Sequence, residues 1–214
     1  MTRPVILLIP GVRGDPAEFD HLAPMLGGFH LLRPAIPEDA GADLRSIAAA
    51  LLAGVDAPRF HVVAGSFGGL LAWAFPEDRV ASITAIGTVP GPTPRTRRAG
   101  WVGRALRAAP ERLYREVYGA HVRAGLAEDG VPADTPSFLP SRRALADRLV
   151  AIGAWGLPAR PPRPSTWMWG ATDAHVTWGS HDVRMAGMEP LCVPGGHRPH
   201  LSHPAEVRRW LPRA

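Results

Sequence analysis

The sequence predicts an α/β protein built on a mostly parallel, six-stranded sheet. Some short apolar runs are continuous rather than alternating, as in residues 4–10, and this is typical of strands buried on both faces. Such runs alternate with segments of helical period through residues 1–87 and again from residue 164. One glycine-rich stretch, residues 61–74, passes directly from an apolar run into a helix. This alternation indicates parallel strands joined by right-handed crossovers, with helices on both faces.

The expected elements follow in order along the chain. Asp15 is a suitable N-cap and Pro16 a suitable first residue for a helix that we expect to reach about residue 26. The expected strands are 4–10, 29–33, 61–64, 79–87, 165–169 and 189–193. The expected helices, besides 15–26 and the one after residue 66, are 43–54, 98–108, 110–127, 141–154, 180–185 and 204–211.

The middle of the chain departs from this alternation. Three of the expected helices follow one another between residues 98 and 154 with no strand between them, and proline-rich stretches at 90–94 and 158–164 bound them. We therefore expect a core made of residues 1–87 and 164–214, with a helical lid, residues 88–163, inserted into it.

Composition narrows the class of protein. The chain has 214 residues, 46% of them hydrophobic, which is enough for one domain with a substantial core. A single cysteine, Cys192, excludes an internal disulfide, and we interpret it as a small buried hydrophobe. No apolar run approaches the roughly 20 residues that span a bilayer, and the first apolar run is too short for a signal peptide. These features favour a soluble, cytoplasmic protein.

All cationic side chains are arginine, and the formal net charge is +5. Arginines gather at the start of the expected lid, where only Glu111 and Glu116 oppose them. The cluster consists of Arg95, Arg97, Arg98, Arg104, Arg107, Arg112, Arg115 and Arg123. A solvated helical face explains it better than a nucleic-acid site, and it also suits an acidic partner or an anionic substrate.

Ser66 is the candidate nucleophile. It lies in Gly65-Ser66-Phe67-Gly68-Gly69, at a sharp turn between the strand and the helix, where a serine projects its hydroxyl above the sheet. The small residues Ala64 and Gly68 let such a turn close. The following helix N-terminus offers backbone N–H groups to developing negative charge. The spacing fits neither a dinucleotide-binding fingerprint nor a phosphate-binding loop.

A serine nucleophile needs a base and an orienting carboxylate. His197 follows the last expected strand, and Asp173 follows the strand before it, so both belong to the same sheet edge as Ser66. Asp182 is the alternative acid, although it lies in an expected helix. His200 and His203 are interpreted as loop residues before the last helix, and His175 and His181 as surface residues. Prolines interrupt the spacing of His197, His200 and His203, so we expect no metal site.

Four segments in this order resemble the α/β-hydrolase superfamily over nearly the whole chain. They are LLIPGVRGD, HVVAGSFGGLLAWAFPEDRVASITAIGT, WGATD and PGGHRPHLSHPAEVRRWL. The short lid is most similar to small carboxylesterases, including those acting on pimeloyl esters of acyl carrier protein. Pro10 and Ala64 replace the histidine and glycine usual in this family, and the N-terminal hairpin is missing. The resemblance implies the strand order 2-1-3-4-5-6.

The resemblance implies a serine esterase with the triad Ser66, His197 and Asp173, an oxyanion hole formed by the N–H groups of Val12 and Phe67, and neither cofactor nor metal. The substrate would be a small ester or thioester, and an acidic carrier protein is a possible partner. A catalytically silent binding protein on the same fold is the alternative. Trp101, Tyr114, Tyr118, Phe138 and Trp155 either line an apolar pocket or pack the lid onto the core.

Overall fold

The structure is a computed structural model centred on a six-stranded parallel sheet in the order β2-β1-β3-β4-β5-β6. It describes residues 3–89, 93–131, 138–155, 165–175 and 190–212. The strands are β1 (Val5–Ile9), β2 (His30–Leu32), β3 (Phe60–Gly65), β4 (Val80–Ile86), β5 (Ser165–Gly170) and β6 (Pro190–Val193). Both the predicted fold class and the predicted strand order are confirmed.

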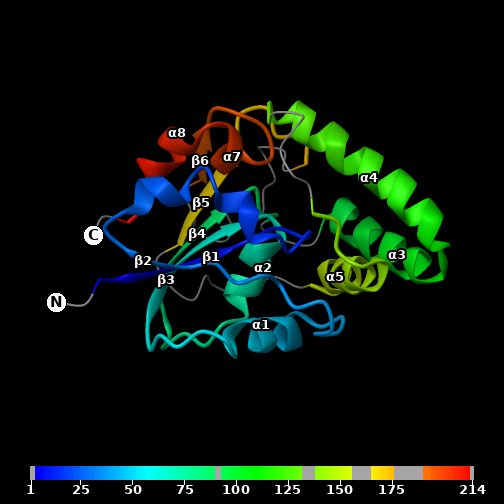
Figure 1. Ribbon diagram of the computed structural model, residues 1–214, viewed down its shortest axis with the longest axis horizontal. Coiled ribbons are helices and arrows are strands. Elements are labelled where there is room, and N and C mark those ends of the chain that lie inside the picture. Colours follow the sequence, from blue (N-terminus) through cyan, green and yellow to red (C-terminus); the bar gives the residue numbers. More distant parts are fainter. Residues whose placement is uncertain (1–2, 90–92, 132–137, 156–164, 176–189, 213–214) are drawn as a thin grey trace.

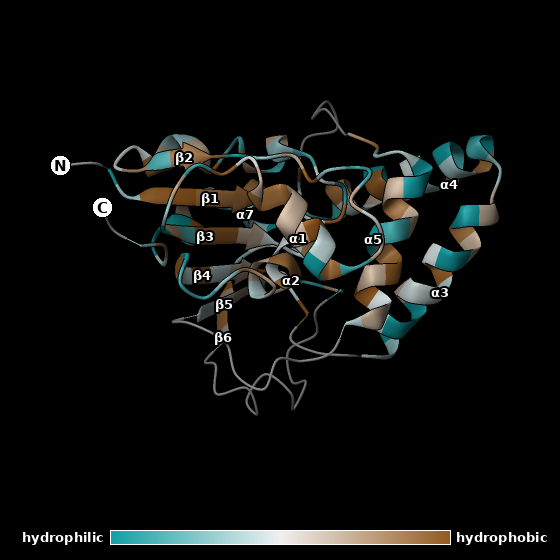
Figure 2. Cartoon of the chain, turned by 90° about the horizontal axis from the view of Figure 1, so that it is seen from below, coloured by the Kyte–Doolittle hydropathy of each residue, from teal (hydrophilic) through white to brown (hydrophobic). Residues whose placement is uncertain are grey.

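Helices cover both faces of the sheet (Figure 1). One face carries α1 (Leu44–Leu52) and α2 (Phe67–Trp73), and the other carries the 3-10 helices η1 (Pro16–Phe19) and η2 (Ala23–Leu26) with α7 (Pro199–Ser202) and α8 (Pro204–Arg208). The remaining helices in the described residues are α3 (Pro94–Ala108), α4 (Glu111–Glu128) and α5 (Arg142–Ala154), all between β4 and β5. The arrowheads of β1 and β3 point toward the side where these three helices lie (Figure 2).

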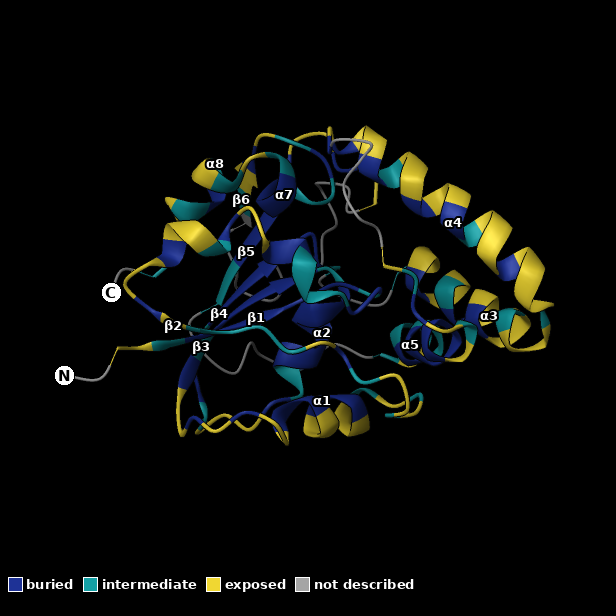
Figure 3. Cartoon of the chain, viewed as in Figure 1, coloured by how far each residue is buried: buried dark blue, intermediate teal, exposed yellow. Residues whose placement is uncertain are grey.

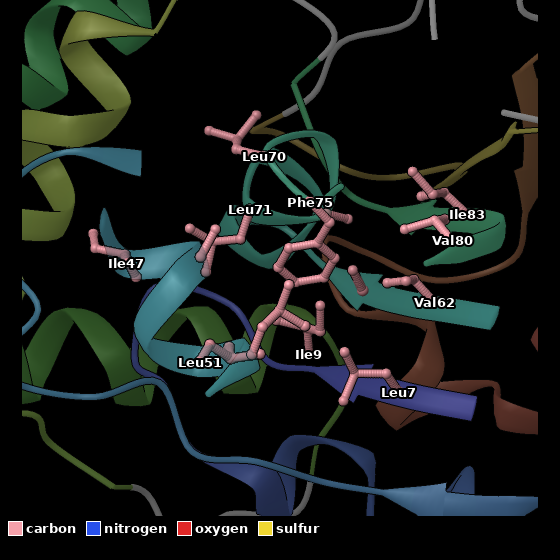
Figure 4. Packing of buried hydrophobic residues seen from close by; sticks show 14 of the residues in the cluster. Leu7, Ile9, Ile47, Leu51, Val62, Leu70, Leu71, Phe75, Val80 and Ile83 are labelled. Carbon is pink, nitrogen blue, oxygen red and sulfur yellow. The ribbon is translucent and has the colours of Figure 1, made fainter. Parts of the chain in front are cut away.

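Alternate residues of each central strand enter two separate cores. In β1, Leu7 and Ile9 pack with α1 and α2, as Figure 4 shows, whereas Ile6 and Leu8 pack with η1, η2 and α8. All four side chains are fully buried, and Figure 3 shows most of the length of the central strands as buried. This two-sided burial explains why the sequence of β1 is continuously apolar.

The predicted helix over 15–26 is wrong in type. Asp15 caps its first turn as expected, since its side chain accepts a hydrogen bond from the N–H of Ala17, but the segment forms two short 3-10 helices. Pro24 lies where a continuous helix would need an N–H donor, and its ring would clash with the carbonyl of Asp20. The segment therefore turns between Phe19 and Ala23.

Two further predictions near the C-terminus need correction. The last helix ends at Arg208, and His200, expected in a loop, lies in the additional helix α7. Pro204 disfavours a helical conformation at the residue before it, so His203, with φ −134° and ψ 53°, separates the two helices. Cys192 is exposed rather than buried, because Leu191 and Val193 face the core and Cys192 points to the other side of the edge strand β6. The expected helix at 180–185 lies outside the described residues.

The helices α3 and α5 pack closely through glycines. A Cβ atom at Gly100 would lie 3.0 Å from the Cα of Gly153, and one at Gly103 would lie 2.7 Å from the carbonyl oxygen of Ala146. The two backbones therefore approach more closely than side chains would allow. The described part of residues 88–163 is entirely helix and connecting loop, and its role as a lid stays a prediction. None of the helices in the described ranges has the length and apolar character needed to cross a membrane.

Candidate active site

Ser66 occupies a strained turn between β3 and α2. Its φ of 45° and ψ of −111° make it the one non-glycine residue with positive φ among the described residues. Strain of this kind costs about 1–3 kcal/mol and persists only where the surroundings impose it. Here the Ser66 N–H donates to the carbonyl of Ile86 at 2.7 Å, and the Thr88 hydroxyl donates to the Ser66 carbonyl at 2.8 Å.

The second and third residues after Ser66, Gly68 and Gly69, must be small for the turn to fit against its neighbours. A Cβ atom at Gly68 would lie 2.6 Å from the carbonyl oxygen of Ile9, and one at Gly69 would lie 2.2 Å from Oγ1 of Thr88. Gly68 thus allows α2 to begin directly against the end of β1. This close approach brings the loop after β1 to Ser66.

The structure brings His197 and Asp173 to Ser66. Nε2 of His197 lies 3.1 Å from Oγ of Ser66, and Nδ1 lies 3.0 Å from Oδ2 of Asp173. The Asp173 side chain is fully buried, and its Oδ1 accepts a hydrogen bond of 2.7 Å from the N–H of His175. The three residues follow the ends of β3, β5 and β6, so the parallel sheet accounts for their meeting.

The end of β4 leaves room for the imidazole. Gly87 has a φ of 59°, and a Cβ atom there would lie 2.5 Å from the carbonyl oxygen of His197 and 3.2 Å from its ring. A larger residue at Gly87 would therefore displace His197. The loop of His197 is also held from α4, because the carboxylate of Asp129 pairs with the Arg198 guanidinium and accepts from the Arg198 N–H.

The other histidines have different surroundings. The His200 side chain is 1% exposed and hydrogen-bonds to Glu18 rather than to Ser66. His203 is exposed and contacts the Ser202 hydroxyl. His175 is exposed, as expected, yet its ring packs edge-on against His197 at 4.8 Å, and partial burial together with the His197 charge lowers its pKa. His181 and the alternative acid, Asp182, lie outside the described residues.

Sequence reasoning missed Glu18, which lies beneath the site in η1. Its Oε1 accepts a hydrogen bond of 3.1 Å from Nε2 of His200, and its Oε2 accepts one of 3.1 Å from the N–H of Gly11. Burial raises the pKa of this carboxyl, but the hydrogen bond from His200 and the charges of His200, Arg13 and Arg198 outweigh burial and lower the pKa to about 2. Glu18 is therefore a buried carboxylate.

Arg148, also missed, holds the other side of the loop after β1. From α5 it donates to the carbonyls of Val12 at 2.9 Å and Arg13 at 2.8 Å, and to that of Ile36 at 2.7 Å. Burial lowers the pKa of this guanidinium. No sequence signal distinguishes Arg148 from its many arginine neighbours, because its partners lie more than 100 positions away.

The proposed oxyanion donors lie next to Ser66. Val12 follows Gly11, whose Cβ position would be 3.4 Å from Cβ of Ser66, and Phe67 is the first residue of α2. Glu18 and Arg148 fix the loop of Val12 from both sides. The arrangement suits the binding of an anion beside Ser66, and the donor roles of Val12 and Phe67 stay predictions.

A cavity of about 270 Å³ opens at Ser66 and His197. Its walls come from the loop after β1, from α3, α4 and α5, and from the loop of His197. A second cavity of about 440 Å³ lies between α1, α2 and α5 and does not include Ser66. Within the described ranges no group of three or more His, Cys, Asp or Glu side chains is placed to hold a metal ion.

The five aromatic residues of the expected lid have separate roles. Tyr118 lines the cavity, and burial raises its pKa to about 12. Tyr114 stacks on Tyr118 and donates its hydroxyl to the Pro140 carbonyl, while Trp155 packs against Trp73 of α2. Trp101 and Phe138 are exposed, so they neither line the cavity nor pack onto the core.

Several arginines of the cluster are engaged in ion pairs. Arg112 and Arg115 pair with Glu116 and Glu111, as the sequence allows, and Arg107 pairs with Asp147 of α5. Of the cluster, Arg95 alone is among the described residues that line the cavity.

Comparisons with known proteins agree with the fold. The model of the alpha/beta hydrolase family matches residues 6–210. No curated protein sequence matches the chain.

Solved structures with the same fold share little sequence with this chain. A hydrolase from Pseudomonas aeruginosa PA01 has a TM-score of 0.78 at 17% identity, with 97% of this chain and 88% of that one covered. A thermophilic esterase from Thermogutta terrifontis has a TM-score of 0.72 at 20% identity, covering 97% and 88%. An enol-lactonase from Burkholderia xenovorans LB400 has a TM-score of 0.72 at 14% identity, covering 98% and 90%.

Proposed function

Because this chain belongs to the α/β hydrolase family, we propose that it is a serine hydrolase that cleaves carboxylic esters through an acyl-enzyme intermediate. One observation carries the proposal. A strained serine lies 3.1 Å from an imidazole whose other nitrogen lies 3.0 Å from a fully buried carboxylate. This is the arrangement of nucleophile, base and orienting acid that acyl transfer requires.

The proposed reaction begins with attack of Ser66 Oγ on the ester carbonyl carbon while His197 Nε2 takes the hydroxyl proton. Asp173 holds the imidazole with Nδ1–H toward its carboxylate and stabilises the imidazolium. The N–H groups of Val12 and Phe67 bind the oxyanion, and each such donor is worth about 3–4 kcal/mol. The ester C–O bond then breaks, and His197 returns the proton to the leaving alcohol. A water molecule then attacks the carbonyl carbon of the acyl-enzyme while His197 takes its proton. The bond to Ser66 Oγ breaks, His197 returns the proton to Ser66, and the carboxylic acid is released.

The test is hydrolysis of p-nitrophenyl esters of increasing acyl length by the wild type and by Ser66→Ala. We expect the substitution to lower kcat by about 10⁴-fold or more, with little change in the unfolding midpoint. Ser82→Ala is a matched control, because the Ser82 hydroxyl also contacts a histidine, His61, at 2.8 Å, but lies outside the cavity. Retention of more than about a tenth of wild-type kcat by Ser66→Ala would falsify the proposal.

Two arms of the same assay address the alternatives. A thioester substrate tests whether the acyl group can come from a thiol carrier rather than an alcohol. A folded wild-type protein that hydrolyses neither esters nor thioesters would favour a silent binding protein instead.

A further inference from the structure

Arg13 is a buried cation without a direct partner among the described residues. It is 6% exposed and lies in the loop after β1, two residues beyond Gly11. Its backbone carbonyl accepts from Arg148, but its guanidinium makes no hydrogen bond or ion pair with any residue that the structure describes. Buried arginines are ordinarily paired, because an uncompensated buried charge is costly. A ligand that supplies the missing partner would account for this position.

The Arg13 side chain belongs to the cavity at Ser66. Arg13 lines that cavity together with Ser66, His197 and Tyr118. Its charge lowers the pKa of Glu18 and opposes the rise in the pKa of Tyr118, so the guanidinium lies within electrostatic range of both. Both oxygens of Glu18 are already engaged by His200 and by the N–H of Gly11. Glu18 therefore leaves the hydrogen-bond donors of Arg13 available.

The rest of the cavity wall is short of carboxylates. Glu18 is the sole acidic residue among the described residues that line it. Arg95 donates to the backbone carbonyls of Ala174 and His175 rather than to a carboxylate, while Arg198 is paired with Asp129. An anionic group entering the cavity thus meets two cations, Arg13 and Arg95, that no described carboxylate neutralises by contact.

We propose that Arg13 binds a carboxylate carried by the acyl part of the substrate, so that the protein prefers half-esters of short dicarboxylic acids. This inference rests on the proposed esterase function. The planar guanidinium donates two parallel hydrogen bonds to a carboxylate, which fixes its orientation as well as its charge. The volume of about 270 Å³ lies just below the usual range for small-molecule sites, about 300–1,000 Å³, and favours a short chain between carboxylate and ester.

The test compares three activated esters with the wild type, Arg13→Gln and Arg13→Lys. The esters are mono-4-nitrophenyl glutarate, the neutral 4-nitrophenyl pentanoate, and an acetate ester whose alcohol part carries the carboxylate. We expect wild-type kcat/KM to be highest for the glutarate ester. In Arg13→Gln the glutarate-to-pentanoate ratio of kcat/KM should fall about 10- to 100-fold, the usual range for a hydrogen bond to a charged group. Arg13→Lys should retain part of the ratio.

Arg209→Gln is the matched control. It removes the same charge from an exposed side chain at the end of α8, where Arg209 pairs with Glu206 at 2.9 Å, and it should leave the ratio unchanged. If Arg13→Gln does not fold, inhibition of the wild type replaces it: glutarate should compete with pentanoate ester hydrolysis far better than glutaramide does.

The outcomes separate this inference from the proposed function. Failure of the wild type to hydrolyse any of the esters contradicts the esterase assignment. Hydrolysis of the neutral ester, with no preference for glutarate and equal inhibition by glutarate and glutaramide, overturns the role of Arg13 alone. Preference for the carboxylate on the alcohol part overturns the acyl-side placement.

Discussion

Two buried side chains of opposite charge hold the loop beside Ser66. Glu18 accepts the N–H of Gly11 from one side, and Arg148 donates to the carbonyls of Val12 and Arg13 from the other. A Cβ atom at Gly14 would lie 2.6 Å from the Arg148 guanidinium, so the loop backbone and this side chain are in close contact. The direction of the Val12 N–H therefore depends on both of these side chains.

Arg148→Met should lower kcat about 10- to 100-fold with a smaller change in KM, because the proposed oxyanion donor, the N–H of Val12, moves while the cavity remains. Steady-state kinetics with a neutral ester measure the separate changes in kcat and KM. Arg142→Met is the control, since Arg142 lies on the same helix and also donates to backbone carbonyls, those of Leu106 and Arg107. Arg142→Met should lower the stability of the protein but leave kcat unchanged. Equal losses of kcat in the two variants would remove the positioning role of Arg148.

The sequence predicts the three residues at Ser66 but not their supports, for a physical reason. Ser66, Asp173 and His197 each follow a strand, and the ends of parallel strands meet at one edge whatever the details of packing. Glu18 and His200 are 182 positions apart and meet only through the packing of η1 against α7. Local sequence carries no signal for such a pair.

Among the elements, α4 connects the helices between β4 and β5 to the loop of His197. Val122 and Leu126 of α4 pack with Leu201 of α7, and Asp129 at the end of α4 pairs with Arg198. Figure 1 shows α4 extending from α3 toward α7. The exposed outer surface of α4 in Figure 3 contrasts with the 3% exposure of the Asp129 side chain.

Asp129→Asn should lower the free energy of unfolding by about 3 kcal/mol, because Arg198, whose side chain is 16% exposed, is left as a largely buried and unpaired charge. Urea denaturation monitored by circular dichroism measures this. Glu116→Gln breaks an exposed pair with Arg112 on the same helix and should cost less than about 0.5 kcal/mol. Similar effects in both variants would show that the Arg198 pair is no stronger than a surface contact.

The sequence predicts the positions of helices and strands correctly where burial determines them. It predicts them wrongly where prolines interrupt the pattern. The apolar runs place the strands to within about two residues, since a central strand needs both faces apolar. The segment 15–26 has a helical pattern but contains Pro24, and the backbone resolves the conflict with two 3-10 helices. Pattern alone does not reveal which of the two constraints prevails.

At the scale of the whole molecule, a carboxylate lies in the interior beneath the site, which makes folding sensitive to acid. The folded-state pKa of Glu18 is about 2, below its ordinary value of 4.5. The stabilisation that ionised Glu18 contributes to the folded state is therefore fully present above about pH 4.5. It is lost as the pH falls toward 2, where folded Glu18 takes up a proton. The difference between the two pKa values of Glu18 corresponds to about 3 kcal/mol in the free energy of unfolding.

Glu18→Gln should flatten the acid dependence of stability. Urea unfolding at several values between pH 5 and pH 2.5 should show the wild type losing up to about 3 kcal/mol more than the variant across this range. Glu116→Gln, on the surface, should follow the wild type. Parallel curves for wild type and Glu18→Gln would mean that Glu18 is not the group responsible.

The central claim is that Ser66 is an activated nucleophile, and covalent labelling tests it most directly. The wild type is incubated with a fluorophosphonate, and peptide mass spectrometry locates the adduct. We expect the adduct on Ser66, none in Ser66→Ala, and strongly slowed labelling in His197→Ala, because the serine then lacks its base. A folded wild type whose Ser66 stays unlabelled, or an adduct on another serine that persists in Ser66→Ala, would contradict the claim.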